Sequence, residues 1–142
     1  MLEVIIVLTL VVLMLGLSTI YFAGFLPAVK FNATGREISA LIRHARSLAR
    51  MNVQTQRLII DLDEKTYGMA GQAAREIPPN VLIRIDDPAS GEILHGKYHL
   101  VFHPSGGMEG GAILLLGGKK KMRIDMDPIT GTTKTVVLSV GF

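Results

Sequence analysis

The sequence predicts an α+β protein in which a long N-terminal transmembrane helix packs on a C-terminal antiparallel β-sandwich. Residues 2–29 are almost wholly apolar, whereas the rest of the chain mixes apolar and polar residues as a folded domain does. From residue 56 onward the apolar residues recur with a period of two, in short segments separated by Gly, Pro, Asn and Asp. We therefore expect a transmembrane helix over 1–29 and a folded domain over 30–142.

The apolar segment is long enough to cross a bilayer. As a helix, residues 2–29 would extend ~42 Å at 1.5 Å per residue, which exceeds the roughly 30 Å hydrocarbon core of a membrane. A secretory signal peptide is the alternative, but the segment is longer than a signal core and no small-x-small cleavage site is evident near its end. We expect an uncleaved membrane helix, kinked by Pro27 where the chain leaves the membrane.

Glu3 is the one charged residue within this apolar segment. A carboxylate at the start of a helix gains from the helix dipole, but it costs a few kcal/mol if it is carried deep into lipid. Position alone leaves two interpretations open. Glu3 either pairs with a cation, such as the α-amino group of another subunit, or lies among the lipid headgroups without a partner.

A second helix is predicted over about residues 34–51. Its start is indicated by Thr34 as a possible N-cap with Glu37 three residues later, and we expect a break from the membrane span around 32–35. Apolar residues recur at three- and four-residue spacing and form a stripe that needs an apolar partner. The members of the stripe are Ile38, Leu41, Ile42, Ala45, Leu48 and Ala49. A sheet supplies such a partner, so we expect this helix to pack on the β-sandwich.

About seven short strands are predicted between residues 56 and 140. Turn residues separate them, as in an antiparallel sandwich or meander, and Asp63-Glu64-Lys65 is predicted to close a first hairpin. The predicted strands are 57–62, 66–70, 81–85, 98–102, 112–116, 122–126 and 133–140.

The chemistry-bearing residues favour a structural protein over an enzyme. The chain has no cysteine, which excludes disulfides, thiolate zinc sites and cysteine nucleophiles. The glycine-rich stretches at 105–111 and 117–118 are followed by strand-like segments, so hairpin turns explain them better than a phosphate-binding loop. His99 and His103 would lie about 13 Å apart along a strand, too far apart to share a metal. We expect no catalytic residue, cofactor or metal.

One basic cluster is dense enough to consider as an anion contact. The net charge is only +3, which permits an anionic partner without requiring one. The cluster could contact lipid phosphate or a nucleic-acid backbone, but no aromatic residue is interleaved to stack on bases. A solvated hairpin tip is the more common role of such a cluster. Its members are Lys119, Lys120, Lys121 and Arg123.

Several motifs, in order along the chain, resemble one family. LEVIIVLTLVVLMLGL is similar to the N-terminal helix of type IV pilins and type II secretion pseudopilins, with Leu2-Glu3 matching the end of their conserved N-terminal pattern. The remainder resembles the minor pseudopilin H group (GspH/FimT-like). The stretches that carry this resemblance are Ala45–Ala49, Leu58–Leu62, Phe102–Gly106 and Asp127–Gly131.

The resemblance implies a pilin-like fold and a role in a filament. Glu3 would be the glutamate that helps subunits dock, and the partners would be other minor and major pseudopilins, inner-membrane lipid and the secretion machinery. It further implies methylation and a single-pass bacterial inner-membrane protein with its C-terminal domain in the periplasm, at or near the tip of a pseudopilus. A type IV pilus minor pilin involved in DNA uptake is the alternative. The family's basic leader and processing site do not precede Leu2-Glu3. Either the start is misassigned or trimmed, which we favour, or this chain is not processed.

Overall fold

The computed structural model describes the backbone of residues 1–139, and the side chains of these residues except 21–26 and 139. One helix, α1 (Leu2–Met51), precedes the strands. Within this range the strands are β1 (Gln56–Asp61), β2 (Thr66–Met69), β3 (Arg75–Glu76), β4 (Leu82–Asp87), β5 (Gly91–Ile93), β6 (Lys97–Phe102), β7 (Met108–Glu109), β8 (Ala112–Gly117), β9 (Lys120–Met126) and β10 (Thr133–Ser139). Val140, the last residue of the final predicted strand, lies outside the described residues.

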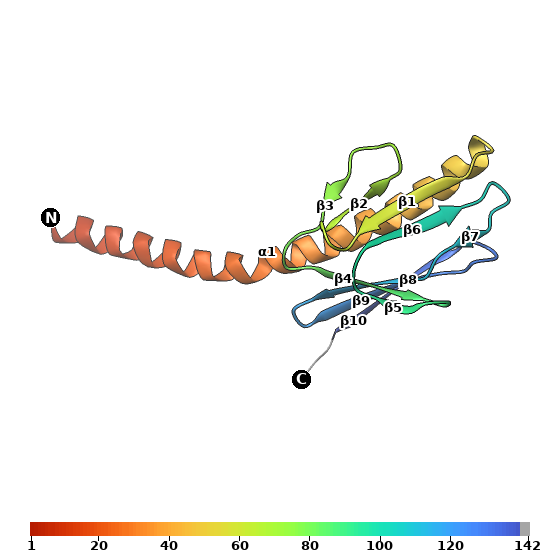
Figure 1. Ribbon diagram of the computed structural model, residues 1–142. Helices are drawn as coiled ribbons and strands as arrows, with labels where there is room; N and C mark the ends of the chain where they lie inside the picture. Colours follow the sequence, from red (N-terminus) through yellow and green to blue (C-terminus); the bar gives the residue numbers. More distant parts are fainter. Residues whose placement is uncertain (140–142) are drawn as a thin grey trace.

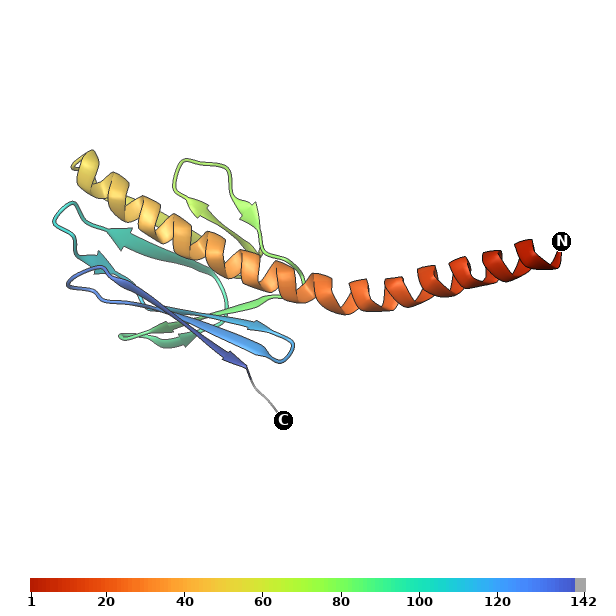
Figure 2. The ribbon, with the colours of Figure 1, turned by 180° about the vertical axis from the view of Figure 1, so that it is seen from behind.

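The predicted break between two helices is wrong, because α1 is continuous from Leu2 to Met51. Thr34 does not cap a new helix; its hydroxyl donates to the Lys30 carbonyl one turn back, at 2.8 Å. Gly35 is buried, and a Cβ there would lie 2.2 Å from the Met122 sulfur. The glycine therefore allows close packing on β9 instead of ending the helix. Pro27 lies inside α1. Figures 1 and 2 show that the helix changes direction in its orange part, between the stretch that stands alone and the stretch beside the sheets.

Two five-stranded antiparallel sheets follow the helix (Figure 1). Their strand orders are β3-β2-β1-β6-β7 and β10-β9-β8-β4-β5. All seven predicted strands are present with ends shifted by one or two residues at most. The sequence analysis missed β3, β5 and β7, which are two or three residues long and too short to show a period of two.

The core lies between the two sheets and the second half of α1. The helix contributes Phe31, Ile38, Ile42, Ala45 and Ala49, all at most 1% exposed, and Leu41 and Leu48 pack against the rim of the same cluster. The predicted apolar stripe is therefore confirmed. Each fully buried large side chain contributes about 1.5–3 kcal/mol to the free energy of unfolding, so this half of α1 is part of the domain. The predicted α+β, pilin-like architecture is confirmed.

Candidate functional site

The first part of α1 stands away from the domain. Leu2–Ile20 is apolar enough to cross a membrane, with a mean hydropathy of 2.5, and none of this stretch is buried by the rest of the chain. Its 19 residues extend about 28 Å, close to the thickness of the hydrocarbon core. Beyond the first turn, the backbone N–H and C=O groups of this stretch form their hydrogen bonds within the helix, as a lipid environment requires. These apolar side chains are therefore available to lipid or to other helices.

Glu3 lies in the first turn of this bare helix and is exposed. Among the described residues, no side chain forms a hydrogen bond or an ion pair with it. The first turn also carries unpaired backbone N–H groups, which favour a negative charge. The geometry leaves Glu3 free to meet a cation outside this chain.

The basic β8–β9 turn lies beside the point where α1 joins the domain. Lys119 and Lys120 line one hollow of about 310 Å³ with Pro27, Ala28 and Asn80. The Asn80 side-chain amide donates to the Pro27 carbonyl at 3.1 Å, which ties the β-domain to the helix at this level. In Figure 1 this turn points toward the end of the domain from which the apolar helix leaves. We call this end the proximal end.

The structure separates the other two members of the predicted basic cluster from this turn. Lys120 is the first residue of β9 and pairs with Gly117 beside the turn. Lys121 and Arg123 lie further along β9, on its outer face, opposite Leu116 and Leu114 of β8. Arg123 donates from Nε to Asp125 at 2.7 Å and from Nη2 to Asp86 at 3.2 Å. The hydrogen bond to Asp125 raises the pKa of Arg123. Its charge is thus shared by two carboxylates, and only Lys119 and Lys120 remain together at the hairpin tip.

Arg123 lines an open cleft of about 520 Å³, whose other charged residues are all acidic and which the sequence analysis did not identify. Asp86, Asp87 and Glu109 contribute to its lining. Behind it, the Tyr98 hydroxyl donates to Asp87 at 2.7 Å and accepts from the Gly111 N–H at 2.7 Å. Burial raises the pKa of Tyr98 to about 12, and the same hydrogen bond lowers the pKa of Asp87. This arrangement joins β4, β6 and the start of β8.

Three of the motifs that carry the family resemblance meet at the opposite, distal end of the domain: Ala45–Ala49, Phe102–Gly106 and Asp127–Gly131. The Met108 N–H donates to the Pro128 carbonyl at 3.1 Å, which joins the turn after β6 to the turn after β9. Gly131 has a φ of +66°, and a Cβ there would lie 2.8 Å from the Gly106 carbonyl oxygen. Glycine is therefore required for both its φ and its close approach.

Arg46, from the helical motif Ala45–Ala49, contacts the turn after β9, and Arg50 lies beside the turn after β6. The Nη2 of Arg46 donates to the Thr130 carbonyl at 2.5 Å, and the Arg50 guanidinium lies next to Gly106. Asp127 accepts the N–H groups of Ile129 and Thr130, which lowers the pKa of Asp127. Three motifs far apart in the sequence thus build one contact. Their role in this structure is to shape the distal end, which spacing along the chain does not reveal.

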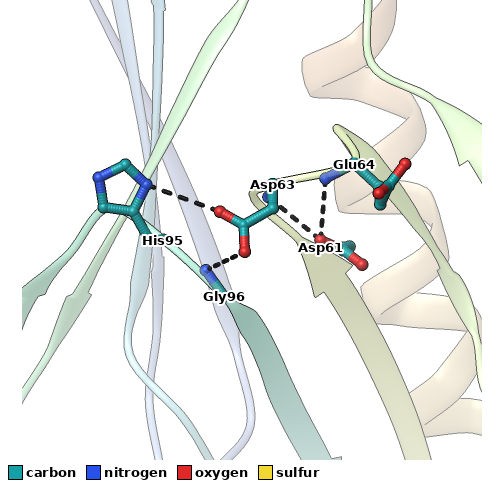
Figure 3. A network of polar contacts seen from close by, with 5 residues as sticks. All are labelled: Asp61, Asp63, Glu64, His95 and Gly96. Atoms are coloured by element: carbon teal, nitrogen blue, oxygen red, sulfur yellow. Dashed lines mark hydrogen bonds and ion pairs between the residues drawn. The ribbon is translucent and has the colours of Figure 1, made fainter.

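A second polar network fixes the hairpin predicted at residues 63–65 (Figure 3). Asp61 is 7% exposed and accepts the N–H groups of Asp63 and Glu64 at 3.1 and 3.0 Å. The Asp63 carboxylate accepts the Gly96 N–H at 3.1 Å and lies 3.6 Å from His95. These contacts join the β1–β2 turn to the loop before β6. They satisfy local backbone groups, which is the common role of Asp in turns.

The histidines do not gather into a ligand set. His99 lies in β6 opposite Ile59, and His103 contacts Glu109 at 3.4 Å. Across the part of the chain that the structure describes, no three His, Asp or Glu side chains approach closely enough to hold a metal ion.

Comparison with known proteins gives a similarity that covers nearly the whole chain. The chain is 23% identical over 135 residues to a type II secretion system protein H from Xanthomonas campestris pv. campestris, covering 95% of this chain and 80% of that relative. No family model matches the chain, and no solved structure matches it. The extent of this similarity, together with a bare apolar helix joined to two antiparallel sheets, confirms the predicted resemblance of this chain to the pilin-like protein H group of type II secretion.

Proposed function

We propose that this chain is a structural minor pseudopilin of a type II secretion pseudopilus, at or near its tip, and supports export of folded proteins across the outer membrane. The observation that carries the proposal is the division of α1. Leu2–Ile20 is bare and apolar, whereas the helix from Phe31 onward is part of the core of the β-domain. One helix therefore links an apolar part that lies in the membrane and contacts other subunits to the folded β-domain.

The proposed location follows from the same division. The apolar part of α1 lies in the bacterial inner membrane, and the β-domain lies in the periplasm. The partners are other minor and major pseudopilins and the secretion machinery. A similarity to a secretion protein H supports a structural role over an enzymatic one.

Glu3 is the proposed assembly residue, and its substitution tests the function. In lipid, a carboxylate is stabilised by a cation on a neighbouring helix, and the exposed first turn leaves Glu3 free to reach one. We expect Glu3→Ala to abolish both secretion and cross-links from residues near Glu3 to other subunits. Thr9→Ala is the matched control, because Thr9 is also exposed on the span but bonds only to the Ile5 carbonyl of its own helix. Normal assembly and secretion by Glu3→Ala would contradict the docking role.

Lys119 and Lys120 are the proposed contacts with anionic lipid. They lie beside Pro27, which is seven residues beyond Ile20 and so about 10 Å from the end of the hydrocarbon core. That distance is about one Debye length at physiological salt, and each lysine near an anionic surface contributes about 1 kcal/mol.

The lipid contact is tested with the full chain in nanodiscs. Anionic lipid is expected to slow hydrogen exchange in the β8–β9 turn, in a salt-dependent manner, and a Lys119→Gln, Lys120→Gln double variant is expected to lose this effect. Lys134→Gln, on exposed β10, is the control. Equal exchange with and without anionic lipid would rule the contact out.

A type IV pilus minor pilin that binds DNA is the second candidate. The exposed basic residues of α1, among them Arg36, Arg43 and Arg50, favour it. Phosphate contacts are strongest at low salt, so binding of duplex DNA by the detergent-solubilised chain in 20–50 mM salt, about the lower end of the usual range, would support this candidate. Absence of binding under those conditions would leave the pseudopilin.

A further inference from the structure

Strand β10 leaves one edge of its sheet open. Within the described residues it pairs only with β9, although with seven residues it is among the longest strands. Edge strands are commonly protected from pairing by proline, charge or shortness. β10 contains no proline and Lys134 as its one charged residue. Alternate N–H and C=O groups along Thr133–Ser139 are therefore available to another strand.

A groove of about 350 Å³ runs between this strand and α1. Thr135 and Val137 line one side, and the helix lines the other with residues that include Gly35 and Ser39. The hydroxyls of Ser39 and Thr135 meet at 3.5 Å between its two sides, Met122 adds to its lining, and Val137 is 55% exposed. The groove thus offers apolar surface beside unpaired backbone groups, the combination that binds extended peptides by strand addition.

Two arginines supply the charge of the groove. Arg36 and Arg43 line it from α1, both are exposed, and neither forms an ion pair among the described residues. They are two helical turns apart, about 10.5 Å along the axis. Carboxylates two or four positions apart in an extended segment lie about 7 or 13 Å apart, a spacing that flexible arginine side chains can meet.

We propose that this groove binds an extended, acidic segment of another protein, which adds a strand to the free edge of β10 and places its carboxylates beside Arg36 and Arg43. A second copy of this chain fits less well. Pairing two β10 edges would bring two sets of these arginines together, and like charges at an interface are costly. The proposal does not depend on the role in secretion, because it rests only on the edge, the groove and its charge.

The test uses the full chain in detergent micelles and a labelled nine-residue peptide of alternating valine and glutamate. We expect this peptide to bind and to slow amide hydrogen exchange in β10. A peptide with lysine in place of glutamate should bind at least about tenfold weaker, since a tenfold change corresponds to the loss of one charge-assisted contact. A glutamate peptide N-methylated along one edge cannot donate backbone hydrogen bonds from that edge, and it should also bind at least about tenfold weaker, since several neutral hydrogen bonds are lost together.

Reversing the charge of the two arginines separates loss of the charged contact from misfolding, because a misfolded protein would not gain affinity for the lysine peptide. An Arg36→Glu, Arg43→Glu double variant should reverse the preference and bind the lysine peptide, whereas Arg57→Glu, an exposed arginine on the other sheet, should leave binding unchanged. Failure of the glutamate peptide to bind, or equal binding of the N-methylated peptide, would overturn the proposal. It would also be overturned if the chain formed dimers in which β10 is protected from hydrogen exchange, or if duplex DNA bound the same two arginines while the peptide did not.

Discussion

The contact between Phe31 and Gly117 gives the sharpest test of how α1 is joined to the domain. Phe31 is 1% exposed, and a Cβ added to Gly117 would lie 2.5 Å from its ring carbon Cδ2. Removing a buried phenylalanine ring costs about 3–5 kcal/mol of the free energy of unfolding. Adding a methyl group to a tightly packed site costs about 1–3 kcal/mol. We therefore expect both Phe31→Ala and Gly117→Ala to destabilise the domain.

The double variant separates this contact from general damage. Once the Phe31 ring is removed, the new methyl group at position 117 no longer collides with it and occupies part of the space it left. The two substitutions should therefore cost less together than the sum of their separate costs, by about 1–2 kcal/mol, as expected for residues in direct contact. In the Phe31→Ala background, Gly117→Ala should be close to neutral.

Urea unfolding of the full chain in detergent micelles, followed by the near-ultraviolet circular dichroism of the tyrosines, measures these costs. The far-ultraviolet signal is unsuitable because micelles preserve the apolar helix. Val29→Ala is the control, since Val29 is 44% exposed and its truncation should change the free energy by about 0.5 kcal/mol or less. Strictly additive costs, or a neutral Gly117→Ala in the parent chain, would refute the packing described here.

Three further predictions concern the β-domain. Arg46→Met should lower the free energy of unfolding by about 1.5–3 kcal/mol, because it removes a charged hydrogen bond. It should also speed amide hydrogen exchange at 103–107 and 127–132. Arg36→Met, the control, should have neither effect. Gly131→Ala should destabilise the domain more than Gly71→Ala, because both have positive φ but only Gly131 has atoms in the way of a Cβ; equal losses of stability would argue against that crowding. Tyr98 has its pKa raised from 10.0 to about 12 in the folded state, so the stability this shift supplies is present below pH 10 and is lost between pH 10 and 12. The Tyr98→Phe variant should therefore lose less free energy of unfolding than the parent chain between pH 10 and 12. If the two chains showed the same dependence of this free energy on pH, the raised pKa of the Tyr98 hydroxyl would be contradicted.

The sequence alone was sufficient to predict the elements whose pattern lies within a short stretch of the chain. The apolar run, the stripe that includes Ile38 and Ile42, and the seven longer strands each repeat with the period of the structure they form. The resemblance to the protein H group was also readable from motifs in order. These features follow from residues near one another in the chain, so no knowledge of the fold was needed to find them.

Tertiary structure decided what depends on residues far apart in the chain. A break in the helix was predicted around 32–35, but Gly35 packs closely against Met122 and α1 runs on without a break. Arg123 looked like one member of a basic cluster, but strand alternation turns it toward Asp86 and Asp125. The physical reason is the same in both cases. Local propensity and local charge are worth about 1 kcal/mol or less per residue, and burial or pairing with a distant partner outweighs them.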